Sequence, residues 1–273
     1  SASSPGGDGY TIKTISQGSR NHLVLGGSRG RGDLYAVYDF LEQDCGVGFF
    51  WNGDRVPKRA TLKFSNINRT ERPYFPRRMT PNACSYVYTC QHWSVQDWCN
   101  ELDYLSKRKI NMHYLTLGRE LVMNRVWKQF GIDQGEPTDW DLWAAHLQRE
   151  VRAYAEKLDM DHFVGQAWGG RVTPEFAALH PEIRYVTRQW IDLPTKYNIH
   201  PADPMFQQVV KATIEEWQKA YGPTHIWDQA PYPETSPGAT AKDKRQLKIE
   251  WARNMTTAIA AADPQGLLYM SGW

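Results

Sequence analysis

The sequence predicts an α/β protein with a small N-terminal α/β domain followed by part of a (β/α)8 (TIM) barrel. Two observations carry this prediction. Before residue 70, short strand-like runs flank one amphipathic helix, and from residue 77 onward short apolar runs alternate with longer amphipathic helices. Such alternation is typical of a parallel sheet with helical crossovers. We therefore expect an accessory domain over residues 1–70, with a polar tail over residues 1–9, and a partial barrel over residues 71–273.

The accessory domain begins with two expected strands, residues 10–18 and 21–25, of which the run HLVL is expected to be the better buried. A third strand is expected over residues 48–51. One helix is expected over residues 32–43, because apolar residues recur there at helical spacing: Leu34, Val37, Tyr38 and Leu41.

Two glycine- or proline-rich segments mark loops in this first part of the chain. The glycine cluster before the helix has neither the GK[ST] ending nor the GxGxxG spacing of a phosphate loop, so we expect no nucleotide site there. The segment NRTERPYFPRR, residues 68–78, is expected to be the linker between the domains.

The barrel part contains about five expected strands, fewer than the eight of a complete barrel, which needs about 250 residues. Their ranges are 78–83, 110–116, 162–167, 224–227 and 266–270. Four amphipathic helices lie between them, with inward stripes formed by Trp98, Leu102 and Leu105; by Trp143, Leu147, Val151, Tyr154 and Leu158; by Phe206, Val210, Ile214, Trp217 and Tyr221; and by Leu247, Trp251, Met255 and Ile259. Because an open half barrel leaves an apolar sheet edge, we expect further polypeptide to complete it.

Composition excludes several classes of protein. The net charge of +2 and the absence of a basic run with aromatic residues argue against a nucleic-acid partner, and no apolar run of membrane-spanning length occurs. The four cysteines lack CxxC spacing, so we expect no metal and no cofactor. Two glycosylation triplets, Asn68-Arg69-Thr70 and Asn254-Met255-Thr256, favour a glycoprotein that is secreted or lysosomal. The 12 Trp and 14 Tyr suit either stacking on sugars or ordinary packing.

The stretch THIWDQAPYPETSP, residues 224–237, indicates where chemistry takes place. His225, Ile226 and Trp227 suit a buried strand, and the prolines that follow cannot continue a sheet ladder. Side chains just past the carboxyl end of a barrel strand line the active site of this fold. Glu234 stands in that place, and it is either a catalytic carboxylate or a solvated loop acid.

A series of short motifs resembles one family of enzymes in order and spacing. The motifs are Asn82-Ala83-Cys84, then Tyr88, Trp93, Trp98, Glu101 and Asp103, then Ile110-Asn111, Gly118 and Glu120, then GGRVTP (169–174), HPEIRYVTRQW (180–190), ADPMF (202–206), HIW (225–227), Glu234, Pro237 and SGW (271–273). Together they resemble the opening of the barrel in the alpha-N-acetylglucosaminidases of glycoside hydrolase family 89. The resemblance covers residues 73–273. The preceding LYAVYDFLEQDCGVGFF resembles the small domain that stands before the barrel in this family and in other hydrolases.

The resemblance implies retaining hydrolysis of terminal α-linked N-acetylglucosamine from glycans. Retaining enzymes of this kind use two carboxyl groups about 5 to 5.5 Å apart, an acid/base and a nucleophile. Glu234 matches the acid/base, and the nucleophile is expected to be a Glu beyond Trp273. Further matches imply a substrate-binding role for Asn82, Cys84, Glu120, Trp168, Trp190 and Trp273, although packing or helix-dipole roles are open for Cys84, Glu120 and the tryptophans.

Three positions depart from the family pattern. The family has Asn where this chain has Pro233, Trp where it has Thr116, and His where it has Arg171. Tyr232, beside Glu234, is a candidate replacement wall of the sugar pocket. The departures favour an alternative, a glycosidase of different sugar specificity on the same scaffold. A second alternative is a non-catalytic carbohydrate-binding subunit, because no nucleophile is recognisable in the chain.

Overall fold

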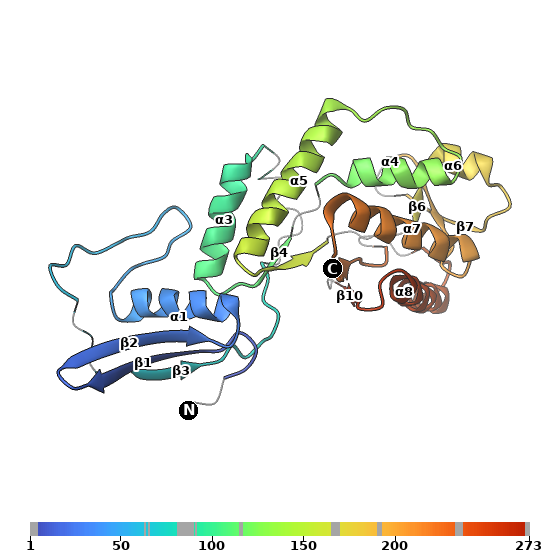
Figure 1. Ribbon diagram of the computed structural model, residues 1–273. Coiled ribbons are helices and arrows are strands. Elements are labelled where there is room, and N and C mark those ends of the chain that lie inside the picture. The colour runs from blue at the N-terminus through green and yellow to red at the C-terminus, as the bar shows by residue number, and fades with distance from the viewer. Residues whose placement is uncertain are drawn as a thin grey trace. The chain divides into compact units, whose positions relative to one another are not determined.

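The computed structural model describes residues 5–62, 64, 66–80, 90, 92–114, 117–164, 170–189, 193–232 and 237–270 (Figure 1). The chain divides into two compact units, residues 1–113 with 151–161, and residues 114–150 with 162–273. The domain boundary near residue 70 stays a prediction.

The first unit is built on a three-stranded antiparallel sheet in the order β2-β1-β3 (Figure 1). Its strands are β1 (Tyr10–Gln17), β2 (Arg20–Gly27) and β3 (Asn68–Glu71), and β1 pairs with both neighbours. The helix α1 (Gly30–Gln43) covers one face and buries Tyr35, Ala36 and Phe40 against Tyr10 and Ile12. The expected order of two strands followed by a helix is therefore confirmed for residues 10–43.

Four expectations for this unit were wrong. The central strand β1, not the run HLVL of β2, supplies the buried residues, because β2 is an edge strand and Val24 is 43% exposed. Residues 48–51 form no strand: Gly48 makes one isolated bridge with Arg55, across a turn in which Gly53 has φ of 129°. The first four residues of the expected linker form β3. Asp8, in the expected tail, is 7% exposed.

The helix α3 (Val95–Lys107) completes the helical layer of this unit and contacts α1. Ser94 and Asp97 form a capping box at its start, which satisfies amide groups that the first helical turn leaves without partners. The expected inward residues Trp98, Leu102 and Leu105 are buried. Residues 78–80 of the expected strand 78–83 are not in a strand, and residues 81–83 lie outside the described residues.

Twelve further elements follow in the described part of the chain. They are β4 (Met112–Tyr114), α4 (Arg119–Gln129), α5 (Asp139–Lys157), β5 (Asp161–Phe163), β6 (Arg171–Val172), α6 (Pro174–Leu179), β7 (Tyr185–Arg188), β8 (Lys196–Ile199), α7 (Pro204–Tyr221), β9 (Ile226–Asp228), α8 (Ala241–Ala262) and β10 (Leu267–Tyr269), with the long helix α5 passing from the second unit into the first.

Parallel pairing links the strands of the second unit that were expected to belong to a barrel. β9 pairs in parallel with β10, and Val164, just after β5, makes a parallel bridge with Trp227 of β9. Helices lie between these strands along the chain, as the alternation predicted. Within the described residues these strands do not close into a barrel.

A second, antiparallel sheet of order β6-β8-β7 was not expected. Its strands are two to four residues long, too short for an alternating pattern to stand out from loop sequence.

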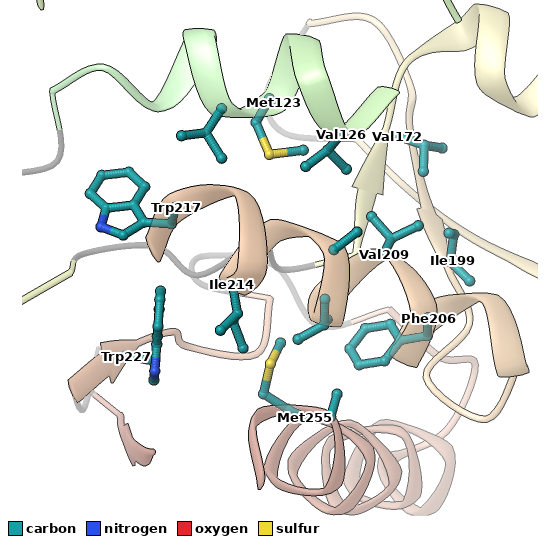
Figure 2. Close-up of a cluster of buried hydrophobic side chains, with 14 of the residues drawn as sticks. Met123, Val126, Val172, Ile199, Phe206, Val209, Ile214, Trp217, Trp227 and Met255 are labelled. Atoms are coloured by element: carbon teal, nitrogen blue, oxygen red, sulfur yellow. The ribbon is translucent and has the colours of Figure 1, made fainter. Parts of the chain in front are cut away.

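The core of the second unit is centred on α7, which lies between α4 and α8 (Figure 2). Figure 2 shows Met123 and Val126 of α4 above α7, and Met255 of α8 below it, beside Ile214. Every expected inward residue of α7 and α8 is buried. Asp203 caps α7 and Pro204 occupies its first turn, and both residue types are typical of the start of a helix.

The stripe predicted for α5 is correct only in its middle. Leu147 and Val151 are buried, whereas Trp143 is 36% exposed and packs against Trp140, with ring centroids 4.9 Å apart. Both tryptophans lie in the first turns of α5. No helix among the described residues is long and apolar enough to cross a membrane.

Candidate functional site

Two of the eight predicted site residues, Glu120 and Tyr232, are described by the structure. Asn82, Cys84, Trp168, Trp190, Glu234 and Trp273 lie outside the described residues, as do Thr116 and Pro233. Their predicted roles stay predictions. Both described residues belong to the second unit and lie in segments that follow strands.

Glu120 faces a cavity of about 460 Å³. The cavity lies between α4 and the segment around β6, so it brings together residues that follow β4 with residues that follow β5. Arg171, one of the three departures from the family pattern, lines the same cavity. Its other lining residues are Arg119, Met123, Trp127, Gln134, Val172, Thr173 and Pro174.

A tight turn fixes the position of Glu120. Gly118, with φ of 76°, precedes α4, and its carbonyl oxygen accepts a 2.7 Å hydrogen bond from the Tyr221 hydroxyl of α7. A Cβ atom at Gly118 would overlap that hydroxyl, so only glycine fits. Glu120 then lies in the first turn of α4, where the helix dipole favours a negative charge.

A group of basic side chains surrounds the small antiparallel sheet next to this cavity. Burial lowers the pKa of Arg188, and the nearby charge of Arg171 lowers it further. The pKa of Lys196 is also lowered, by burial and then by Arg171 and Arg188. The positive charge of Arg171 therefore acts on both of these side chains and disfavours their charged forms. The local sequence of β7 and β8 gave no signal of this grouping, because the pairing of the strands creates it.

Tyr232 lies in the core and not on an open surface. Its side chain is 5% exposed and packs in the cluster that contains Trp227 and Trp251. Burial raises the pKa of its phenol, and the charges of Arg188 and Glu250 act on it in opposite directions. Its role as a pocket wall stays a prediction.

A second cavity, of about 430 Å³, lies beside the segment that follows residue 236. Pro237 and Gly238 line it together with Glu250 of α8 and His200. Burial lowers the pKa of His200, Arg184 lowers it further, and Glu250 and Asp203 oppose that shift. Sequence reasoning missed both His200 and Glu250, because each becomes part of a cavity wall only when β7, β8 and α8 pack together.

Parallel βα units, with polar side chains gathered in the segments that follow the strands, define an enzyme scaffold of the barrel type. A family model for the alpha-N-acetylglucosaminidase (NAGLU) TIM-barrel domain matches residues 78–146 and 136–273. The chain therefore belongs to the alpha-N-acetylglucosaminidase family, as its motifs predicted. It is 21% identical to human alpha-N-acetylglucosaminidase, with 100% of this chain and 40% of that protein aligned.

Solved structures give the same fold. Family 89 glycoside hydrolase structures from Clostridium perfringens, in complex with PUGNAc and with the substrate GlcNAc-alpha-1,4-galactose, have TM-scores of 0.81 and 0.80 at 17% identity. Each of these two alignments covers 97% of this chain and 33% of the chain of the solved structure. A family 20 exo-beta-N-acetylglucosaminidase from Vibrio harveyi has a TM-score of 0.55 at 14% identity. Its alignment covers 96% of this chain and 44% of the Vibrio harveyi chain. The chain thus spans less than half the length of each of these relatives.

Proposed function

We propose that this chain is part of a retaining glycoside hydrolase that releases terminal α-linked N-acetylglucosamine from glycans. The observation that carries the proposal is the family match over residues 78–273, in which Glu234 follows β9 as an acid/base residue of a barrel would. The substrate GlcNAc-alpha-1,4-galactose in a relative of similar fold supports the sugar class.

In this proposal Glu234 protonates the glycosidic oxygen as the sugar leaves, and then removes a proton from the water that completes the reaction. The nucleophile is a Glu that follows Trp273, on a strand that further polypeptide contributes. Glu120 and Arg171, which share a cavity, are proposed to hold polar groups of the glycan. Asn82, Cys84, Trp168, Trp190, Tyr232 and Trp273 are proposed to complete the pocket.

Replacing Glu234 with Gln tests this assignment, because the amide keeps the size of the side chain and cannot donate a proton as an acid. We expect kcat on an alkyl α-N-acetylglucosaminide to fall about 10²- to 10⁴-fold, while a competitive inhibitor binds as it does to the unchanged protein. The measurement uses the full-length protein. Glu175→Gln, on the exposed first turn of α6, is the matched control and should retain activity. Unchanged turnover in Glu234→Gln would remove the catalytic assignment.

A different sugar specificity is the second candidate function. Arg171, beside Arg188 and Lys196, replaces the family's His with a permanent positive charge, which favours a substrate with other polar groups at that position. Activity on matched aryl α-glycosides of N-acetylglucosamine, glucose and N-acetylgalactosamine separates the two candidates. Binding of these sugars without turnover of any of them would favour the non-catalytic alternative.

A secreted or lysosomal location is also a proposal. The two glycosylation triplets support it, and Asn68 is exposed on β3. The second triplet gives weaker support, because Asn254 is partly buried and its side chain hydrogen-bonds to Gln207 and Glu250.

A further inference from the structure

Trp51 holds its indole ring at the surface of the first unit. Trp51 is 63% exposed, and its neighbour Phe50 is 54% exposed. Both lie on a tight turn, in which the Gly53 amide donates a 3.1 Å hydrogen bond to the Phe50 carbonyl oxygen. An antiparallel bridge between Gly48 and Arg55 closes this turn. Exposed aromatic side chains that lie together mark a binding surface more often than single ones do.

Three contacts with α3 and its flank hold the turn in place. The Trp51 indole N–H donates a 2.5 Å hydrogen bond to Glu101 Oε2. Lys107 forms a 2.6 Å ion pair with Asp54, and its ammonium group lies 5.7 Å from the centre of the Phe49 ring. Because the ring is oriented before any ligand arrives, binding a ligand costs little conformational freedom at this side chain.

Two more tryptophan rings connect Trp51 to the core of the unit. The ring centroids of Trp51 and Trp93 are 6.5 Å apart, and the ring planes are tilted by 30°. Trp93 packs edge to face against the buried Trp98, with centroids 5.0 Å apart. Trp93 is itself partly exposed, so the surface carries two neighbouring rings and a third, buried ring supports them.

The carboxylate of Glu101 places a hydrogen-bond acceptor at the edge of the Trp51 ring. Its Oε2 accepts from the indole, and its Oε1 has no hydrogen-bond partner among the residues that the structure describes. Burial raises the pKa of Glu101, and the hydrogen bond from Trp51 opposes that shift. A partly desolvated carboxylate with an unused oxygen is stabilised by a hydroxyl donor that reaches it.

We infer that Trp51, Trp93 and Glu101 form an accessory binding surface for a neutral glycan chain. The flat rings suit the C–H faces of sugar rings, and the carboxylate beside them accepts hydrogen bonds from sugar hydroxyl groups. The charge of Glu101 disfavours glycans that carry carboxylate or sulfate groups. A protein segment on the same rings would cover this carboxylate and would have to supply its partner, whereas a glycan carries hydroxyl donors along its whole length.

The test measures binding of tetra-N-acetylchitotetraose to the full-length protein by isothermal titration calorimetry. This neutral chain has β linkages, so an α-specific hydrolase does not cleave it, and a competitive inhibitor at saturation keeps it out of the candidate active site. The choice of N-acetylglucosamine units rests on the proposed function, but binding requires no turnover. We expect Trp51→Ala to raise the Kd at least about tenfold. Glu101→Ala should raise it about fivefold.

Three further variants serve as controls. Trp51→Phe keeps a flat ring and should bind within about threefold of the unchanged protein, whereas Trp51→Leu keeps only apolar bulk and should bind as weakly as Trp51→Ala. Tyr74→Ala removes another aromatic side chain of the first unit, which is 91% exposed and packs against Phe75. It should bind the chain as the unchanged protein does. Thermal unfolding verifies that every variant is folded.

Several results would overturn the inference. Unchanged binding in Trp51→Ala would do so, and a lowered thermal stability with it would show that further polypeptide covers the ring. Full binding by Trp51→Leu would show that stacking is not used, and no binding by the unchanged protein would remove the surface altogether. Turnover by Glu234→Gln tests the hydrolase separately. If that variant keeps its activity while Trp51→Ala loses the glycan, the proposed function fails and the binding surface is retained.

Discussion

At the scale of a single residue, Asp8 is a buried carboxylate that connects distant segments of the first unit. It accepts hydrogen bonds from Arg31 at 2.6 Å, from Arg78 at 2.8 Å and from Asn111 at 2.7 Å. These donors come from three separate stretches of chain, so Asp8 ties the start of α1 to residues 78 and 111. Burial on its own would raise the pKa of Asp8, but the hydrogen bonds from Arg78, Arg31 and Asn111 outweigh it and hold the pKa below its ordinary value.

We expect Asp8→Ala to destabilise the protein by about 3 kcal/mol at pH 7, because it leaves the buried Arg31 and Arg78 guanidinium groups short of a partner. A group whose folded pKa is depressed stabilises the fold fully above its unfolded pKa and loses that effect as the pH falls through the folded value. The difference in free energy of unfolding between the two proteins should therefore shrink below about pH 3.9. Urea unfolding at pH 7 and at lower pH measures it.

Asp8→Asn provides the control, since it keeps the shape of the side chain and removes the charge. A difference between Asp8→Ala and the unchanged protein that did not depend on pH would contradict the electrostatic account. The glycine- and serine-rich sequence around Asp8 resembles a solvated tail, and only its long-range partners reveal its role.

At the scale of an element, α4 owes its position to one glycine. Gly118 turns the chain in the left-handed region and lets the Tyr221 hydroxyl of α7 reach its carbonyl oxygen. The contact between α4 and α7 places Glu120 at the cavity that it shares with Arg171.

We expect Gly118→Ala to lower the free energy of unfolding by about 2 to 4 kcal/mol, since the new methyl group both strains the backbone and displaces Tyr221. Combining it with Tyr221→Phe, which removes the displaced hydroxyl, should recover part of that loss, so the two effects are not additive. A double-mutant cycle by urea unfolding measures the coupling. Simple addition of the two effects would show that Tyr221 is not what excludes a side chain at Gly118.

At the scale of the whole molecule, the strand β10 leaves apolar side chains exposed. Among the described strands it pairs with β9 alone, and Leu267, Tyr269 and Met270 are 44%, 37% and 51% exposed. Met270 lines an apolar groove together with Pro231 and Ile249. An unpaired strand with apolar side chains is a template for pairing with another strand.

A protein made of residues 1–273 alone is therefore expected to self-associate more than the full-length protein. Light scattering after size-exclusion chromatography measures this at matched concentration. Leu267→Lys places a charge at the strand and should reduce the association. A monodisperse fragment that Leu267→Lys leaves unchanged would show that β10 needs no cover from further polypeptide.

Local patterns in the sequence predict much of this architecture. The helical spacing of Phe206, Val210 and Ile214, and of the inward residues of α8, follows from the 3.6-residue period alone, and Asp203 and Pro204 mark the start of α7. The end of β9 at Asp228 follows from the prolines after it. The order of the motifs was enough to indicate the family. These features depend on neighbours within a few residues, which is why they can be read from the sequence.

Long-range packing decides the remaining features. The central place of β1, the partners of Asp8, the sheet β6-β8-β7 and the cavity shared by Glu120 and Arg171 all arise from contacts between segments far apart in the chain. The left-handed backbone of Tyr232, with φ of 50°, belongs with them, because no local preference favours it and only a core that buries the ring keeps it in place. A sequence pattern indicates which side chains tend to be buried, and the tertiary structure determines which of them contact one another.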